Sequence, residues 1–262
     1  MKKTIALITG ASGGIGYELA KLMSKECDTL ILVARNGERL NEVKKELERA
    51  SPVMLKTFQA NLASEEAVEE IYRELENSHI AVDILINNAG FGDYGFFVDT
   101  DWKKASDMIA VNISAVTHMT KLFAKGMIER KNGKIMNVAS TAAFQPGPLM
   151  AVYYASKAYV LSFSESLANE LKGSGVTVTA LCPGPTATGF AAAANIKNTR
   201  LFKLLKPATA ADVARFGYEA MMKGHTIAVQ GMLNRLLAFS VRLSPRKLVA
   251  AVVRHLHKNI PS

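Results

Sequence analysis

The sequence predicts a single α/β domain built on a doubly wound, parallel β-sheet, with a C-terminal helical extension. Three observations support this prediction. Short apolar runs, typical of strands buried on both faces, alternate along the chain with longer segments of helical character. Glycine-rich and polar motifs fall directly after these runs. The chain of 262 residues, 49% of them hydrophobic, contains no long linker, low-complexity stretch or repeat that would divide it.

The expected strands and helices follow one another in alternation. In chain order, the strands are expected at residues 3–9, 29–33, 53–58, 82–86, 134–138, 176–181 and 226–229. The helices are expected at residues 14–26, 37–50, 64–77, 101–130, 151–172 and 209–223. This order predicts a Rossmann-type sheet, covered by helices on both faces, in which a ligand crevice lies at the carboxyl ends of the strands.

Local sequence features support the prediction of individual strands and helices. Residues 3–9 form an apolar run that glycine stops, as expected for a short buried strand. Leu40, Val43 and Leu47 recur at helical spacing on one side of an otherwise charged segment. Ser64 precedes the third helical segment and is its predicted N-cap, because its side-chain oxygen can accept a hydrogen bond from a free backbone N–H.

The connection between the first strand and the first helix has the composition of a phosphate-binding turn. It reads Thr-Gly-Ala-Ser-Gly-Gly-Ile-Gly over residues 9–16. Glycine lets the backbone turn sharply and approach a pyrophosphate, and the free N–H groups of the following helix favour an anion. A plain tight turn is the alternative, but the position in an alternating chain favours a dinucleotide. The predicted contacts are Gly10, Ser12, Gly14, Ile15 and Gly16.

The residue after the second strand bears on the type of nicotinamide cofactor. An acidic side chain there would bind the ribose 2′-hydroxyl of NAD and repel a 2′-phosphate. The chain has Arg35 instead, and a guanidinium can hold a phosphate through two hydrogen bonds. We therefore expect NADP(H) to be preferred over NAD(H), although an ordinary solvated arginine is the alternative.

The glycine spacing of Gly10, Gly14 and Gly16, together with the Asn-Asn-Ala-Gly motif at residues 87–90, resembles the short-chain dehydrogenase/reductase family. The resemblance covers roughly residues 4–190. The family often has Asp-Leu at the adenine. This chain has Asn61-Leu62 there, and the side-chain carbonyl oxygen of Asn61 is expected to accept from the adenine amino group. A Pro-Gly motif at residues 183–188 resembles the family's site for the nicotinamide carboxamide. The resemblance implies cofactor contacts by Asn61, Leu62, Asn88, Ala89, Gly90, Pro183, Gly184, Thr186 and Thr188.

A tyrosine and a lysine four residues apart, Tyr153 and Lys157, share one face of a predicted helix. A nearby ammonium favours a phenolate, so we expect it to lower the pKa of the tyrosine. The family resemblance adds Asn112 and Ser140 and implies a catalytic tetrad. In this tetrad Tyr153 transfers the proton, and Lys157 adjusts the pKa of Tyr153 and contacts the nicotinamide ribose. Ser140 polarises the substrate oxygen, and Asn112 holds a water. Tyr154 is expected to pack or to line the pocket.

The resemblance implies an NADP(H)-dependent oxidoreductase that moves hydride between nicotinamide and a carbonyl or secondary alcohol. The alternative is a cofactor-binding regulatory or scaffolding relative without significant turnover. The substrate pocket is expected among residues 91–97, 141–150 and 189–206, which suit a hydrophobic small molecule. The aromatic and apolar candidates there either line the pocket or pack into the core. They are Phe96, Phe97, Phe144, Leu149, Met150, Phe190 and Phe202.

The charge of the chain is concentrated in its last third. Twelve Lys and Arg residues and two acids follow residue 188, whereas the earlier part is nearly neutral. We expect residues 1–230 to form the Rossmann-type dinucleotide-binding and catalytic domain, and residues 231–262 a basic amphipathic extension packed on it. The apolar side of the extension carries Leu248, Val249, Val252, Val253 and Leu256. We favour docking on protein, and peripheral contact with an anionic membrane is the alternative.

The remaining expectations are mostly absences. The two cysteines, Cys27 and Cys182, fit reduced thiols in the cytoplasm. The sequence has no run of about 18 apolar residues, so no membrane span is expected. The five histidines are scattered, so no metal site is expected. We expect no nucleic-acid partner and, by the family resemblance, a homodimer or homotetramer.

Overall fold

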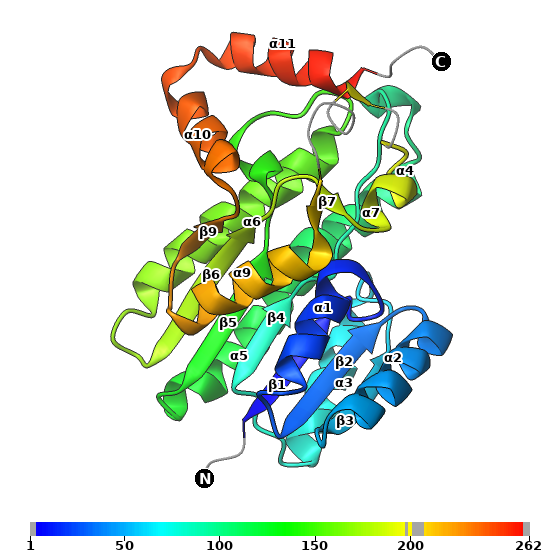
Figure 1. Ribbon diagram of the computed structural model, residues 1–262, viewed down its shortest axis with the longest axis vertical. Helices are drawn as coiled ribbons and strands as arrows, with labels where there is room; N and C mark the ends of the chain where they lie inside the picture. Colours follow the sequence, from blue (N-terminus) through cyan, green and yellow to red (C-terminus); the bar gives the residue numbers. More distant parts are fainter. Residues whose placement is uncertain (1–3, 197–198, 201–206, 259–262) are drawn as a thin grey trace.

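The computed structural model describes residues 4–196, 199–200 and 207–258 of the chain (Figure 1). Its centre is a seven-stranded sheet in the order β3-β2-β1-β4-β5-β6-β9, with every neighbouring pair parallel. The strands are β1 (Ile5–Thr9), β2 (Thr29–Ala34), β3 (Met54–Gln59), β4 (Ile84–Asn87), β5 (Gly133–Val138), β6 (Val176–Cys182) and β9 (Ile227–Val229). The order reverses between β1 and β4, which is where a doubly wound sheet opens a ligand crevice.

Helices cover both faces of the sheet (Figure 1). They are α1 (Gly14–Met23), α2 (Gly37–Ala50), α3 (Glu65–Asn77), α4 (Trp102–Ile109), α5 (Val116–Glu129), α6 (Ala151–Glu170), α7 (Phe190–Ala193), α9 (Ala210–Met222), α10 (Met232–Ser240) and α11 (Arg246–His257). Successive strand side chains point to opposite faces. Ile8 of β1 therefore packs with α1, α2 and α9, whereas its neighbour Leu7 packs with α3 and α5. The predicted doubly wound fold is confirmed.

Local capping explains where several helices begin. The Ser64 hydroxyl accepts a hydrogen bond from the Ala67 N–H at 3.2 Å, as predicted. Thr209 accepts in the same way from Asp212 N–H at 3.0 Å, so the helix expected from residue 209 begins one residue later, at Ala210. The first helix ends earlier than expected, at Met23.

The helical segment expected over residues 101–130 is not one continuous α-helix. A π-helical turn, Ala110–Ala115, separates α4 from α5. The sequence predicted helical structure within this segment but not the interruption, because hydrophobic periodicity alone does not report the extra residue that a π turn inserts. The turn contains Asn112, and π turns of this kind are frequent at functional sites.

The chain between β6 and α9 forms small elements that the sequence pattern did not predict. Thr186–Ala187 (β7) pairs in parallel with Ala208–Thr209 (β8), and the four-residue helix α7 lies between them in sequence. Pairing over two residues is too short to leave a periodic signal in the sequence. This small sheet joins the two ends of the segment expected to carry part of the substrate pocket.

The C-terminal extension consists of two helices joined by a short 3₁₀ turn, Val241–Leu243. In Figure 1, α10 and α11 lie beyond the carboxyl ends of the strands. Val249 and Val253 of α11 are buried against Met150 and Tyr154. Leu248 and Val252, which we expected on the same apolar side, are instead exposed. Residues one position apart lie about 100° apart around a helix, so only one of the two stripes can face the domain.

Candidate active site

A cavity of about 860 Å³ lies at the carboxyl ends of the central strands. It brings together most of the residues that the sequence singled out. The predicted residues on its wall are Gly10, Ser12, Gly14, Ile15, Arg35, Leu62, Asn88, Ala89, Gly90, Ser140, Tyr153, Lys157, Pro183, Gly184, Thr186 and Thr188. Three predicted residues, Gly16, Asn61 and Asn112, do not line the cavity.

The turn after β1 has the backbone that its glycines allow. Gly10 has a φ of +67° and Gly14 a φ of +55°, the left-handed region that side chains disfavour. A Cβ atom on Gly16 would lie 2.3 Å from the Gly10 carbonyl oxygen, so Gly16 lets α1 approach the turn closely. This leaves the N-terminus of α1 open to the cavity as a cradle that fits a dinucleotide pyrophosphate.

Asn88 ties this cradle to the neighbouring strand. Its side-chain amide donates to the Thr9 carbonyl oxygen at 2.9 Å and to the Gly10 carbonyl oxygen at 3.2 Å. The Thr9 hydroxyl in turn accepts from the Ala89 N–H at 3.0 Å. The motif after β4 therefore fixes the turn after β1 as well as forming part of the cavity wall.

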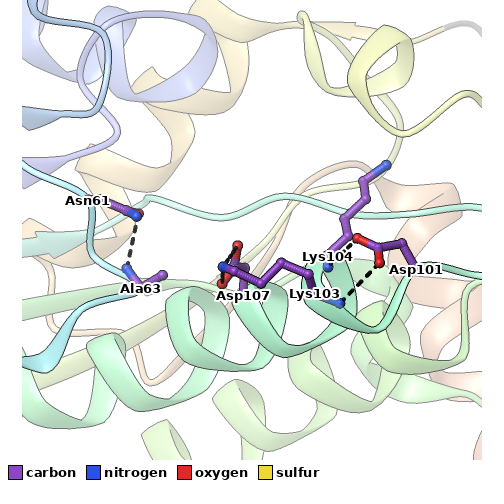
Figure 2. A network of polar contacts seen from close by, with 6 residues as sticks. All are labelled: Asn61, Ala63, Asp101, Lys103, Lys104 and Asp107. Atoms are coloured by element: carbon purple, nitrogen blue, oxygen red, sulfur yellow. Dashed lines mark hydrogen bonds and ion pairs between the residues drawn. The ribbon is translucent and has the colours of Figure 1, made fainter.

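Asn61 lies in the turn that follows β3, and Figure 2 shows its side chain directed at the backbone of Ala63. The side-chain oxygen accepts a hydrogen bond from the Ala63 N–H at 3.2 Å. This oxygen, which we expected to accept from an adenine amino group, thus serves its own turn, whereas the next residue, Leu62, lines the cavity.

Helix α4, at the right of Figure 2, is fixed at its start by Asp101. The Asp101 carboxylate accepts from the N–H groups of Lys103 at 3.3 Å and Lys104 at 3.0 Å. Lys103 also pairs with Asp107 one turn on, and the Lys104 ammonium lies 2.6 Å from Asp93. The Asp101 and Lys103 contacts lie within the helix and its cap, whereas the pair of Lys104 with Asp93 joins α4 to the loop after β4.

Asn112 is fully buried behind the cavity wall. Its amide nitrogen donates to the Phe91 carbonyl oxygen and to the Ser156 hydroxyl, both at 3.0 Å. Its amide oxygen accepts from the Phe91 N–H at 3.2 Å. Ser156 donates to the Tyr153 carbonyl oxygen at 2.7 Å. Asn112 therefore joins the loop after β4 to the helix that carries Tyr153.

The Tyr153 side chain is partly buried on the cavity wall, and loss of hydration raises the pKa of its phenol to about 12. The polar Ser140 hydroxyl acts in the opposite direction and lowers the pKa. Ser140 is held by the Ala142 N–H, which donates to its oxygen at 3.1 Å. The pKa of Tyr153 is thus raised rather than lowered, because the loss of hydration outweighs the effect of Ser140.

Lys157 reaches the same region from the next turn of α6. Its ammonium donates to the Val138 carbonyl oxygen at 2.7 Å and lies 5.9 Å from the centre of the Tyr153 ring. Burial lowers the pKa of Lys157 to about 8. The ammonium therefore lies beside the tyrosine, as the spacing of the two residues predicted, but the phenol is not its hydrogen-bond partner.

The far end of the cavity contains a residue that sequence reasoning missed. His257, at the end of α11, lines the cavity and is only 1% exposed. Its Nε2 lies 2.9 Å from the Tyr154 hydroxyl, and its Nδ1 lies 2.8 Å from the Pro148 carbonyl oxygen. Burial lowers the pKa of His257. No spacing links these residues, which are more than a hundred positions apart, so the sequence carried no signal for this contact.

The expected pocket residues divide into two groups. Met150 and Phe190 line the cavity, with Ala193 and Ile196 beside them. Phe96 and Phe97, in contrast, are each 57% exposed. The other aromatic and apolar candidates among the described residues, Phe144 and Leu149, also lie off the cavity wall, and Phe202 lies outside the described residues. The family resemblance indicated the segments, but the sequence did not show which of their side chains turn inward.

One group of potential metal ligands lies at the surface, away from the cavity. Glu65, Glu69 and His118 bring ligand atoms within 4.8 Å of one another. Both carboxylates are exposed, and groups of this kind are common without an ion. The sequence did not indicate this group, because Glu65 and Glu69 lie in α3 whereas His118 lies in α5, about fifty residues further along the chain.

Comparison with known proteins agrees with this geometry. The short chain dehydrogenase family model matches residues 4–199. Mouse 17-beta-hydroxysteroid dehydrogenase type 3 is 34% identical over 198 residues, which are 74% of this chain and 64% of that protein. A putative ketoacyl reductase of Streptomyces coelicolor is 36% identical over 190 residues, 72% of each chain. A short-chain dehydrogenase from Sphingobium yanoikuyae, solved in complex with NADPH, is 28% identical with a TM-score of 0.82 over 92% of this chain and 93% of that chain. The chain belongs to the short-chain dehydrogenase/reductase family of NAD(P)-dependent oxidoreductases.

Proposed function

We propose that the protein is an NADP(H)-dependent oxidoreductase that transfers hydride between nicotinamide and a carbonyl or secondary alcohol carbon of a hydrophobic small molecule. One observation carries the proposal. The Tyr153 phenol and the Ser140 hydroxyl lie on the wall of the same cavity that the glycine cradle opens into. A proton donor and a dinucleotide site within one cavity are what carbonyl reduction requires.

The cofactor would be held along the cavity by the cradle at one end and by the Pro183–Thr188 turn at the other. The bound nicotinamide supplies or accepts the hydride. Gly10, Gly14 and the N-terminus of α1 would hold its pyrophosphate. Thr186 and Thr188, with the turn between β6 and α7, would hold the carboxamide end and fix which face of the ring meets the substrate.

We assign the transfer of the proton to Tyr153. Because burial raises its pKa, the phenol keeps its proton at neutral pH and can donate it to a substrate oxygen. Ser140 would hold and polarise that oxygen. Lys157 would contact the nicotinamide ribose and carry positive charge near the phenolate, and Asn112 positions the Tyr153 helix against the loop after β4. We propose no role in proton transfer for Tyr154.

NADP(H) is proposed as the preferred cofactor because of Arg35. It lies exposed at the end of β2 on the cavity wall, with its guanidinium 5.7 Å from the centre of the Phe91 ring. Within residues 4–196, 199–200 and 207–258, Arg35 forms no ion pair, so its charge is available for a 2′-phosphate. The NADPH bound to the related Sphingobium yanoikuyae dehydrogenase is consistent with this preference.

The substrate is proposed to be a bulky, apolar ketone or the corresponding alcohol. Met150, Phe190, Ala193 and Ile196 form an apolar wall near Tyr153, and the Phe190 ring lies 5.1 Å from the Tyr153 ring. An apolar wall with a few directed polar groups selects hydrophobic ligands. Relatives named for hydroxysteroid and ketoacyl substrates support this class.

The test is NADPH consumption with a panel of bulky cyclic ketones, 3-oxoacyl thioesters, small aldehydes and sugars. We expect turnover with members of the first two groups and little with sugars. The Tyr153→Phe variant serves as the control for background oxidation. Absence of NADPH and NADH turnover over the whole panel, in a protein that binds the cofactor, would favour a regulatory relative without turnover.

Residues 1–230 are proposed as the dinucleotide-binding and catalytic domain, and residues 231–262 as an extension packed on it. The burial of Val249, Val253 and His257 against this domain supports the division. No helix among the described residues is both long and apolar enough to cross a membrane. Cytoplasmic location and homo-oligomerisation stay predictions.

A further inference from the structure

An apolar surface runs along the outer side of α10. Met232, Leu236, Phe239 and Leu243 recur at the spacing of one helix face, and each is between 60% and 76% exposed. Leu233 and Leu237 lie beside this stripe and are about half exposed. A helix of a soluble domain normally turns such a stripe into the core, so an outward stripe of this length indicates a partner surface. We call these six side chains the α10 face.

Helix α11 and the loop beside it also expose apolar side chains. Leu248 and Val252 of α11 are exposed, about 100° around the helix from the buried Val249 and Val253. The Arg254 guanidinium lies 5.8 Å from the centre of the exposed Phe96 ring, so the loop after β4 lies beside α11. The extension is therefore held to the domain by one side and presents the other.

The charged residues of the extension itself all have one sign. Arg235, Arg242, Arg246, Lys247, Arg254 and Lys258 are all exposed. The sequence has no acidic residue after Glu219. Exposed apolar side chains whose charged neighbours within the extension are all cations match the boundary between the acyl chains and the phosphate headgroups of an anionic bilayer.

We propose that the α10 face, with the flanking cations, binds the surface of an anionic lipid bilayer. The protein would then be a peripheral membrane protein whose α10 lies in the plane of the interface. This inference goes beyond the proposed oxidoreductase function and does not rest on it. Docking of the extension on its own domain, favoured by the sequence, is compatible with it, because Val249, Val253 and His257 provide that contact and the α10 face takes no part in it.

A second copy of the chain fits this surface less well. A two-fold contact through one patch brings the same residues of both subunits together. Arg242, Arg246 and Lys247 of one subunit would then face the equivalent cations, with no acid in the extension to pair them. An anionic lipid surface satisfies the same charges, and for this reason we assign it as the occupant.

Lipid binding would also bring the substrate cavity close to the membrane. The outer side of α11 carries Leu248 and Val252, whereas His257, on its inner side, lines the cavity. One helix therefore separates the proposed lipid surface from the cavity, and an apolar substrate dissolved in the bilayer would have a short path to it.

The test uses the full-length protein with phosphatidylcholine vesicles, with and without phosphatidylserine, in sedimentation at low and high salt. We expect binding to the vesicles that contain phosphatidylserine, weakened by salt because headgroup attraction is screened. Two triple variants separate the two contributions. Arg242→Gln, Arg246→Gln and Lys247→Gln together should weaken vesicle affinity by about a hundredfold. Leu233→Gln, Leu236→Gln and Phe239→Gln together should weaken it by at least about tenfold.

Two control variants match these changes elsewhere on the molecule. Lys25→Gln, Lys45→Gln and Arg49→Gln together remove three exposed charges from α2 and the turn after α1, and Met54→Gln replaces a side chain 66% exposed on β3. Both should bind vesicles as the wild type does. The proposal is overturned if the wild type does not bind anionic vesicles, or if the controls lose binding as much as the α10 variants. It is also overturned if sedimentation velocity shows an oligomer that Leu236→Gln dissociates while vesicle binding is absent.

Discussion

The hydroxyl of Tyr154 lies 2.9 Å from Nε2 of His257 and joins the helix beside the proposed catalytic tyrosine to the last turn of α11. The Pro148 carbonyl oxygen, 2.8 Å from Nδ1, can only accept, so Nδ1 carries a proton. In the neutral imidazole Nε2 is then an acceptor, and Tyr154 donates to it. The C-terminal extension thereby contributes His257 to the cavity wall and is tied to α6 by a specific hydrogen bond.

This contact predicts an energetic coupling between two residues that are far apart in sequence. Tyr154→Phe and His257→Leu should each lower the free energy of unfolding by about 1–3 kcal/mol, because each leaves a buried polar partner unsatisfied. The double variant should lose less than the sum of the two, by about 1 kcal/mol. Denaturant unfolding of the four proteins measures this coupling. Strict additivity would show that the hydrogen bond does not contribute to stability.

The buried histidine also predicts a pH dependence. Loss of hydration is the main cause that lowers the His257 pKa below its ordinary value of 6.5, and the hydrogen bond to Pro148 only partly offsets it. The unfolded chain therefore takes up a proton at a pH at which the folded protein does not. The resulting stability is present above about pH 6.5 and is lost as the pH falls through the lowered pKa.

Unfolding free energies measured at about pH 7.5 and about pH 5.5 test this dependence. The wild type should lose more stability between these values than His257→Leu does, because the variant lacks the titrating group. The difference between the two proteins isolates His257 from the other histidines and the carboxylates. An identical loss in both would mean that His257 is not the group responsible.

Arg35 predicts the cofactor preference. Arg35→Ala should lower the ratio of kcat/KM for NADPH to that for NADH by about ten- to a hundredfold, as expected for a charge-assisted contact of about 1.5–3 kcal/mol. Arg39→Ala is the matched control, because Arg39 pairs with Glu42 and does not line the cavity. Equal use of both cofactors by the wild type, or an equal effect of the two variants, would contradict the assignment of the NADP(H) preference to Arg35.

Two neighbouring glycines of the cradle predict opposite outcomes. A Cβ atom on Gly16 would lie 2.3 Å from the Gly10 carbonyl oxygen, whereas a Cβ atom on Gly13 meets nothing within 4 Å. Gly16→Ala should therefore lose at least about 2 kcal/mol of stability and bind NADPH weakly, because α1 must shift. Gly13→Ala should keep a stability close to that of the wild type, whatever its added methyl group does to the cofactor in the cavity that Gly13 lines. Thermal unfolding and cofactor titration of both variants give the comparison, and equal behaviour would mean that close approach does not matter here.

The sequence predicted the central sheet and most of the cavity because these depend on local signals. Buried strands leave apolar runs, and caps such as Ser64 and Thr209 lie next to the helices they start. The family resemblance supplied Ser140 and Asn112. The contact of His257 with Tyr154 could not be predicted, because it depends on how the extension folds back over the domain.

Two further differences between the sequence-based predictions and the structure have physical reasons. The raised pKa of Tyr153 reflects burial, which residue spacing does not report. Hydrophobic periodicity found an apolar side on the last helix but placed Leu248 and Val249 together, although only Val249 faces the domain. Which stripe of an amphipathic helix is covered depends on its neighbours, and α10 was not predicted as a separate helix.

The assignment of proton transfer to Tyr153 is tested most directly by comparing Tyr153→Phe with Tyr154→Phe, using the best ketone of the panel and NADPH. Removal of a positioned general acid costs about a hundred- to ten-thousandfold in rate. We expect kcat of Tyr153→Phe to fall by this amount while its NADPH affinity, measured by titration, stays within a few-fold of the wild type. Tyr154→Phe should keep most of its turnover. Wild-type turnover in Tyr153→Phe, together with an inactive Tyr154→Phe that still folds and binds NADPH, would contradict the assignment.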